Sequence, residues 1–322
     1  MTRNFISASV LVFSTLTGNS FAADGRLQDA QVVLSDSGDI TFIGGVGYTF
    51  LQAEEIVYDT AGNRISALYW ESEAPVITGT LEARFAGPWT LKASATVGFS
   101  GDSRMEDYDW LDAAPSYTFN DWSDRSIHPQ TELDHYFTGD IAFGRDFEIR
   151  DTVILNLHGG FKYTDVKWTS YGGSYVYSEA GFRDDIGSFP DNVRGISYQQ
   201  QFPGVFLGAE ATTRHNGWTL ALQARGGLNF EVRDEDHHWQ RDLRFREDFG
   251  MLPFVSLSGR MEYSLTENTN LFLAGTFEQH FSKIGDGRIY EIASGAPVEA
   301  FQDGAGLEFR SVTLSGGFRV EF

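Results

Sequence analysis

Two short clusters in this 322-residue chain combine side chains that can activate a water molecule. Asp107 and Asp109 lie two positions apart, and so do Asp236 and His238. In an extended chain, residues i and i+2 project from the same face, so each pair should present its two side chains together. The histidine could take a proton from water while its aspartate partner fixes the tautomer and the opposed carboxylates position the water. The spacing therefore predicts a site for hydrolysis.

Two other interpretations of these clusters stay open on residue types alone. Loops of an acidic exported protein carry aspartates for solvation, and aspartate and histidine at close spacing can also bind calcium or zinc. The second cluster lacks the glycine and the spacing of a calcium loop, and the chain has no HExxH motif, so we expect no metal. It also has no GxSxG motif, no cysteine and no glycine-rich phosphate loop, which leaves serine, cysteine and phosphate-transfer chemistry with little support.

The amino terminus predicts export. Residues 1–22 have the features of a secretory signal: Arg3, an apolar run from Phe5 to Leu16, and the small-residue cleavage site Ser20-Phe21-Ala22. We expect a mature chain, residues 23–322, that forms a single domain outside the cytoplasm. No later stretch reaches the roughly 20 apolar residues that a transmembrane helix needs.

Composition and charge narrow the fold and the partners. With 0 cysteines there are no disulfides, so stability must come from a large regular hydrogen-bonded structure. The 35 glycines and 15% aromatic residues favour an all-β chain rich in turns. The net charge of -21 argues against nucleic acid as a partner, because phosphates would be repelled, and it fits basic peptides or proteins.

Ten segments show the alternation of apolar and polar residues that is typical of strands. They are Ile40 to Phe50, Ile65 to Phe85, Trp89 to Ser100, Leu133 to Phe147, Thr152 to Tyr171, Arg194 to Thr213, Trp218 to Val232, Pro253 to Leu265, Asn270 to Ser282 and Leu307 to Phe322. The last segment has apolar residues on one face, as barrel strands with one face in lipid do. It ends on a phenylalanine, which resembles the C-terminal signal of bacterial outer-membrane barrels. This pattern predicts an all-β, ten-stranded antiparallel transmembrane β-barrel with long extracellular loops. A soluble β-sandwich is the alternative.

The predicted connections alternate between short and long, as an up-and-down barrel requires. The long ones cover residues 51–64, 101–132, 172–193, 233–252 and 283–306. Both acidic clusters fall in such loops, the second and the fourth, and hence on one extracellular rim. The expected location is the cell outer membrane, with the active site facing the extracellular side.

Several motifs resemble those of the omptins, a family of outer-membrane proteases of the aspartyl type built as ten-stranded barrels. The resemblance covers nearly the whole mature chain and is carried by Asp107 to Asp112, Trp122 to Asp124 followed by His128-Pro129, Gly172 to Tyr177, Gly181 to Pro190, Asp234 to Trp239 and Asp303 to Glu308. It implies an endopeptidase that cleaves at basic, preferably dibasic, sites.

Carried over position by position, the resemblance implies a catalytic pair at Asp107 and Asp109 and a dyad at Asp236 and His238. His237 is the alternative histidine, but the family's spacing selects His238. In the implied mechanism His238 is the general base for a water held between it and Asp107, Asp236 orients His238, and Asp109 helps to hold the water.

The resemblance also implies how the substrate is bound. The carboxylates for the arginine before the scissile bond match Glu55 and Asp234, and Asp124 matches an acid that would favour a basic residue after the bond. Paired carboxylates select a guanidinium because it binds them bidentately.

One departure concerns lipid. Family members that need lipopolysaccharide carry a Tyr-x-Glu-x-Arg pattern and a further arginine where this chain has Phe161, Tyr163, Asp165 and Gln201, so the basic phosphate-contacting groups are missing here. Lys162 and Lys167 lie nearby and are the candidate substitutes, so a lipopolysaccharide requirement does not carry over directly. We expect no cofactor, a monomer and contact with outer-membrane lipid. A non-catalytic adhesin that binds basic host proteins, or a small channel, are the alternative functions.

Overall fold

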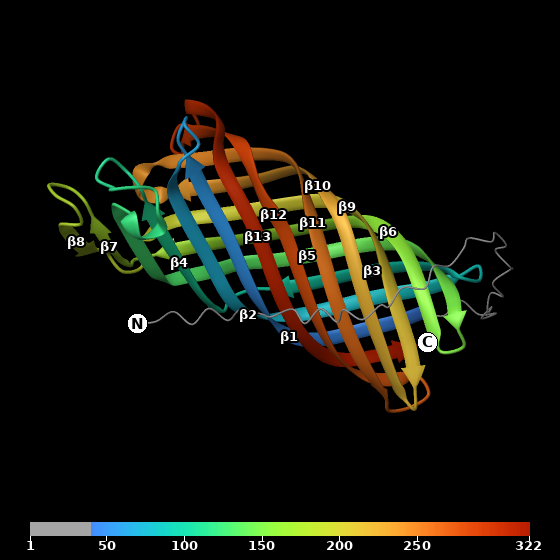
Figure 1. Ribbon diagram of the computed structural model, residues 1–322. Coiled ribbons are helices and arrows are strands. Elements are labelled where there is room, and N and C mark those ends of the chain that lie inside the picture. Colours follow the sequence, from blue (N-terminus) through green and yellow to red (C-terminus); the bar gives the residue numbers. More distant parts are fainter. Residues whose placement is uncertain (1–39) are drawn as a thin grey trace, which may run out of the picture. The chain divides into compact units, whose positions relative to one another are not determined.

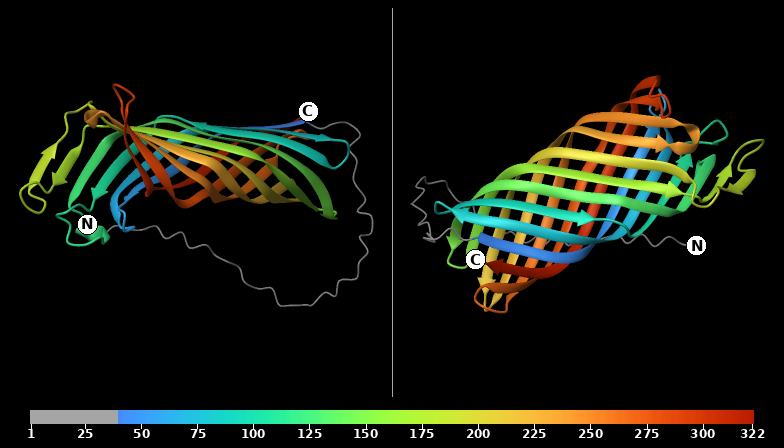
Figure 2. Two further views of the ribbon diagram at one scale, coloured as in Figure 1. Left: turned by 90° about the horizontal axis from the view of Figure 1, so that it is seen from above. Right: turned by 180° about the vertical axis from the view of Figure 1, so that it is seen from behind.

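The computed structural model describes residues 40–322, so the predicted signal at residues 1–22 lies outside the described residues. The described chain is almost entirely antiparallel strands, joined into a closed ring (Figures 1 and 2). The strands are β1 (Ile40–Tyr58), β2 (Arg64–Phe85), β3 (Trp89–Gly98), β4 (Asp102–Asp109), β5 (Asp124–Arg150), β6 (Val153–Tyr171), β7 (Ser174–Tyr177), β8 (Asp185–Ser188), β9 (Arg194–His215), β10 (Trp218–His238), β11 (Leu243–Ser264), β12 (Thr269–Glu291) and β13 (Pro297–Glu321). Two 3₁₀ turns, η1 (Phe119–Asp121) and η2 (Trp239–Arg241), complete the elements.

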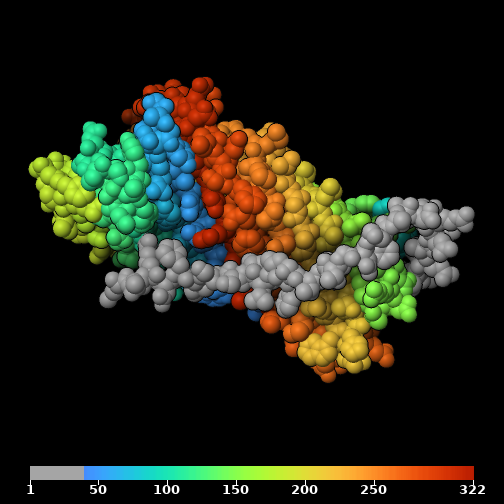
Figure 3. Space-filling view, viewed as in Figure 1, coloured from blue at the N-terminus to red at the C-terminus, as the bar shows by residue number. Residues whose placement is uncertain are grey.

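The ring has ten strand positions, which confirms the predicted barrel. β3 and β4 share one position, since each pairs with β2 on one side and β5 on the other. β1 pairs with β13 and closes the barrel, and the two strands lie side by side on the face seen in Figure 3. β7 and β8 form a hairpin that extends the wall beside β5. No helix among residues 40–322 is long and apolar enough to cross a membrane.

The strands are longer than the sequence predicted, and the prediction that the acidic clusters lie in loops was wrong. Asp107 and Asp109 lie on β4, and residues 234–238 complete β10. Apolar alternation marks where a strand meets lipid, but cross-strand hydrogen bonding does not depend on it. The walls therefore continue beyond the apolar part of the barrel, and the connection between β10 and β11 shrinks to η2.

The outward face carries a belt of exposed apolar side chains, as expected of strands that meet lipid. Val46, Ile141, Leu207 and Leu273 are all more than half exposed. Along β10 the belt ends near Leu228, after which the exposed positions are charged: Glu231 and Arg233. The final residues of β10 therefore lie beyond the membrane-spanning segment.

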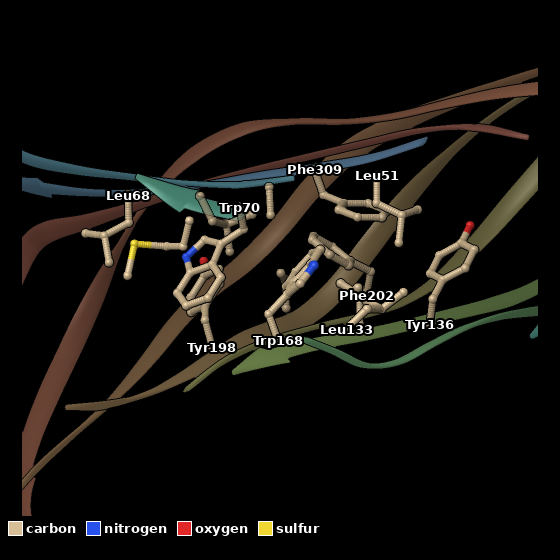
Figure 4. Close-up of a cluster of buried hydrophobic side chains, with 14 of the residues drawn as sticks. Leu51, Leu68, Trp70, Leu133, Tyr136, Trp168, Tyr198, Phe202 and Phe309 are labelled. Atoms are coloured by element: carbon tan, nitrogen blue, oxygen red, sulfur yellow. The ribbon is translucent and has the colours of Figure 1, made fainter. Parts of the chain in front are cut away.

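Aromatic side chains fill the barrel interior below the end of β10 (Figure 4). Trp70 stacks between Trp168 and Tyr198, with ring centroids 6.1 and 5.7 Å away, and Phe202 stacks on Phe309. Further along the same strands, towards the short turns, the interior is ionic: Lys162 pairs with Glu278, Arg225 with Asp140 and Lys92 with Glu210. The aromatic cluster separates this ionic interior from the strand ends that carry the acidic clusters.

Candidate active site

The two acidic clusters line one cleft of about 900 Å³ at the end of the barrel. β4 and β10 lie on opposite sides of the ring, so Asp107 and Asp109 belong to one wall and Asp236 and His238 to the other. The predicted i, i+2 arrangement is confirmed within each strand. Closure of the barrel brings the two walls together.

Asp236 and His238 form a close pair. The Nε2 atom of His238 lies 2.6 Å from Oδ2 of Asp236, whose side chain is 1% exposed. The imidazole packs against Phe245, with ring centroids 5.1 Å apart. The neighbouring His237 points to the other face, where it stacks on Trp239 and is not part of the cleft lining. Strand alternation therefore distinguishes the two histidines, and His238 is the one in the cleft.

The opposite wall holds carboxyl groups that resist ionisation. Burial raises the pKa of Asp107 well above its ordinary value, and the charges of Asp109 and Asp236 add to this effect. Burial also raises the pKa of Asp109, to about 6, although a hydrogen bond from Ser66 opposes the shift. Like charges held this close favour sharing of a proton between them. The pair can therefore accept or return a proton at near-neutral pH.

The residues predicted to bind substrate occupy three different environments. Glu55 on β1 lines the cleft and is 4% exposed. Asp234 is equally buried but lies behind the cleft surface, where its Oδ2 accepts a hydrogen bond of 2.8 Å from the hydroxyl of Tyr198. Asp124 is not among the lining residues, and its Oδ1 accepts a hydrogen bond from the backbone N–H of Ser178. Asp124 thus tethers the β7 segment to the start of β5.

Sequence reasoning missed a serine–histidine pair in the same cleft. Ser126 and His128, two positions apart on β5, both line it. The Nδ1 atom of His128 lies 2.5 Å from the carbonyl oxygen of Gly172 and must donate to it, so Nε2 accepts from the hydroxyl of Ser126 at 2.9 Å. Burial lowers the pKa of His128, which keeps the ring neutral. The i, i+2 spacing that marked the other pairs was the available signal here.

Glu247 on β11 is a second residue that sequence reasoning missed. It lies directly opposite Asp234 in the β10–β11 register, lines the cleft and is 5% exposed. Burial raises its pKa well above the ordinary value, and the charge of Asp234 adds to this effect. Its position could not be deduced without knowing where the hairpin turns.

The outer wall near the end of β6 carries an acidic rather than a basic group. Asp165 accepts hydrogen bonds from Gln199 and Gln201 at 2.7 and 3.1 Å and lies 2.9 Å from Nε2 of His135. Lys162 points into the barrel, where it lies 3.0 Å from Glu278, so the suggestion that it replaces a lipid-contacting cation was wrong. Side chains alternate between the two faces of β6, so Lys167, two positions after Asp165, lies on the same outer face. No group of three or more His, Cys, Asp or Glu residues within 40–322 has a geometry that could hold a metal ion.

Comparison with known proteins places this arrangement in a family. The model of the Omptin family matches residues 37–322. This chain belongs to the omptin family. It is 28% identical to Protease 7 of Escherichia coli O157:H7 over 284 residues, which cover 84% of this chain and 86% of that protein. It is 26% identical to the plasminogen activator of Yersinia pestis over the full length of both chains.

The solved structure of the outer-membrane protease OmpT from Escherichia coli has the same fold as this omptin. The TM-score is 0.83 at 24% sequence identity, over 91% of this chain and 100% of that chain. The predicted fold class and family are thereby confirmed, and the chain is an outer-membrane barrel protease.

Proposed function

We propose that this omptin hydrolyses peptide bonds next to basic residues with a water molecule activated in the cleft between β4 and β10. The observation that carries this proposal is the Asp236–His238 pair on one wall of a cavity whose other wall carries Asp107 and Asp109. We propose that the water attacks the peptide bond directly, without a covalent intermediate.

Each side chain has a role that its environment supports. His238 takes a proton from the water as the oxygen attacks the carbonyl carbon, and Asp236 holds the imidazole and balances its charge. Asp107 and Asp109 hold the water from the opposite wall, and their raised pKa values let the pair carry a proton near the tetrahedral intermediate. The leaving amine then receives a proton from His238, which returns the site to its initial state.

The charge of the cleft supports a basic substrate. Glu55 supplies a buried carboxylate with one oxygen that has no hydrogen-bond partner, and Asp234 supplies another behind the surface. An arginine side chain can satisfy such oxygens bidentately, whereas a neutral side chain leaves them unpaired at a cost. Asp124 contributes negative charge beside Asp109, with which it is paired in register, and does so while tethered to Ser178.

The cleft lies at the barrel end opposite the short turns, and we propose that it faces the extracellular side, as outer-membrane barrels place their short turns on the periplasmic side. We propose that the protein works as a monomer. With Lys162 inside the barrel and Asp165 at the outer wall, we propose that activity does not require a phosphate-bearing lipid. Cleavage assays in neutral detergent with and without lipopolysaccharide test this point.

The decisive experiment compares His238→Ala with His237→Ala, two substitutions in adjacent residues on opposite faces of β10. We expect His238→Ala to lower kcat/KM for an Arg-Arg reporter peptide by about 10²–10⁴-fold, the usual contribution of a general base. His237→Ala should retain activity, and both barrels should keep heat-modifiable migration. Wild-type cleavage by His238→Ala would refute the assignment, and loss of activity with EDTA that zinc restores would refute a metal-free mechanism. Binding of basic proteins without any cleavage would favour an adhesin.

A further inference from the structure

Three buried carboxylates meet beside the catalytic dyad, and each has an oxygen without a hydrogen-bond partner. These atoms are Oε2 of Glu55, Oδ1 of Asp234 and Oε2 of Glu247. Each side chain belongs to a residue that is at most 5% exposed. Buried polar atoms are normally hydrogen-bonded, and buried charges are normally paired. None of the ion pairs formed among residues 40–322 involves any of the three. The carboxyl groups of Asp234 and Glu247 are hydrogen-bonded to each other instead, so no basic side chain compensates this part of the cleft.

The three carboxylates do not have equal access to the cleft. Glu55 and Glu247 line it, from β1 and β11, but Asp234 does not. Asp234 is held from behind by the Tyr198 hydroxyl, which in turn accepts a hydrogen bond of 2.8 Å from Nε2 of Gln200. The Tyr198 ring is fixed by stacking on Trp70. Asp234 is thus anchored to the aromatic interior, and Glu247 lies directly across the hairpin from it.

We propose that Glu247 is a specificity-determining residue that contacts the basic side chain of the substrate together with Glu55, while Asp234 supports both from behind. This inference rests on the proposed function, and it names the acid that touches the substrate. Two carboxylates that approach from different strands and a third behind them offer acceptors in more than one direction. A guanidinium has five N–H donors in a planar fork and can meet such a set, whereas the compact ammonium of lysine has three. The pocket should therefore prefer arginine over lysine.

The test uses three peptides that differ only before the scissile bond: arginine, lysine or citrulline, the last being a neutral analogue of arginine. We expect Glu247→Gln to lower kcat/KM for the arginine peptide roughly ten- to a hundredfold, as removal of a hydrogen bond between charged groups does, through KM more than kcat. The rate for the citrulline peptide should stay unchanged or rise. Glu247→Asp should restore part of the arginine preference.

The matched control is Glu235→Gln on β10. Glu235 lies next to Asp234 in sequence but on the other face of the strand, where it pairs with Arg246. It should leave the ratio of arginine to citrulline cleavage unchanged. An equal loss on all three peptides in Glu247→Gln would show a structural role and overturn the proposal, as would an unchanged ratio.

Binding separates this inference from the proposed function. In the His238→Ala barrel, arginine amide should bind at least tenfold more tightly than citrulline amide by calorimetry, and the additional Glu247→Gln substitution should reduce that difference, with Glu55 retaining the remainder. If the wild type binds arginine amide preferentially but cleaves no peptide, the proposed catalysis is refuted and the proposed arginine pocket is supported. If the wild type cleaves the peptides but Glu247→Gln does not change binding of arginine amide, only the assignment of Glu247 to the pocket is refuted.

Discussion

At the scale of single residues, this omptin concentrates acids where they are costly to ionise. Glu55, Asp234 and Glu247 are buried together without a cation, and their pKa values are raised chiefly by burial. A substrate cation would compensate these charges during binding. Under the proposed function, the free enzyme gives up some of its own stability to keep these acids ready for a basic substrate.

This arrangement predicts a stability that falls as pH rises. Burial raises the pKa of Asp234 to about 7, whereas in the unfolded chain it stays near 3.8, so the native state binds more protons between pH 4 and 7. Unfolding then becomes easier as pH rises through this window. Asp234→Asn removes the ionisation and should stabilise the barrel at pH 8 by on the order of 4 kcal/mol, with little effect at pH 4.

Urea unfolding of folded barrels at both pH values measures this difference. The Asn side chain can still accept the hydrogen bond from Tyr198, so the comparison isolates the charge. Equal destabilisation of Asp234→Asn at the two pH values would contradict a raised pKa. Activity on arginine peptides should fall in the same variant.

At the scale of elements, the position of the Asp107–Asp109 wall depends on the break between β3 and β4. Gly101 has φ +131°, and a Cβ atom there would come within 2.4 Å of the carbonyl oxygen of Glu73 and 2.8 Å of Cα of Ala74. Both contacts are with backbone atoms of β2, which cannot move aside as the end of a flexible side chain could. Gly101 thus allows β4 to continue in register on β2 after the break.

We therefore expect Gly101→Ala to displace β4 and with it Asp107 and Asp109, the carboxylates that we propose to be catalytic. A displacement of about 1 Å in a catalytic group can lower the rate by about 10²-fold, so kcat/KM should fall on that order while the barrel still folds. Gly79→Ala is the control, because a Cβ atom at Gly79 on β2 meets nothing within 4 Å. Kinetics of the two variants provide the measurement, and equal activity would refute the role of the break.

At the scale of the whole molecule, charge and the closed ring act together. The chain has a formal net charge of -21, and the cleft carries several carboxylates at one end of the barrel. An acidic cleft attracts a basic peptide over distances comparable to the Debye length. Encounter with the substrate should therefore be sensitive to salt.

We expect kcat/KM for an Arg-Arg peptide to fall about tenfold or more between roughly 10 mM and 1 M salt, as the Debye length shortens from about 30 to about 3 Å. The citrulline peptide, with less charge, should respond more weakly. Initial rates measured well below KM report this effect. A salt response that is the same for both peptides would rule out electrostatic attraction to the substrate's charge.

The sequence by itself determined the barrel and the pairs within each strand. Period-2 alternation is a local property, so it revealed the ten strand positions and the shared face of Asp236 and His238. It could not show where a strand ends, since hydrogen bonding continues past the lipid, and it therefore assigned both acidic clusters to loops.

Only the tertiary structure decided which pairs meet and which acids reach the cleft. Closure of β1 on β13 and the register of each hairpin are long-range properties that no local pattern contains. They bring β4 opposite β10, place Glu247 across from Asp234, and turn Lys162 into the barrel. In a barrel, alternation gives each residue its face, but the register and the closed ring decide its neighbours.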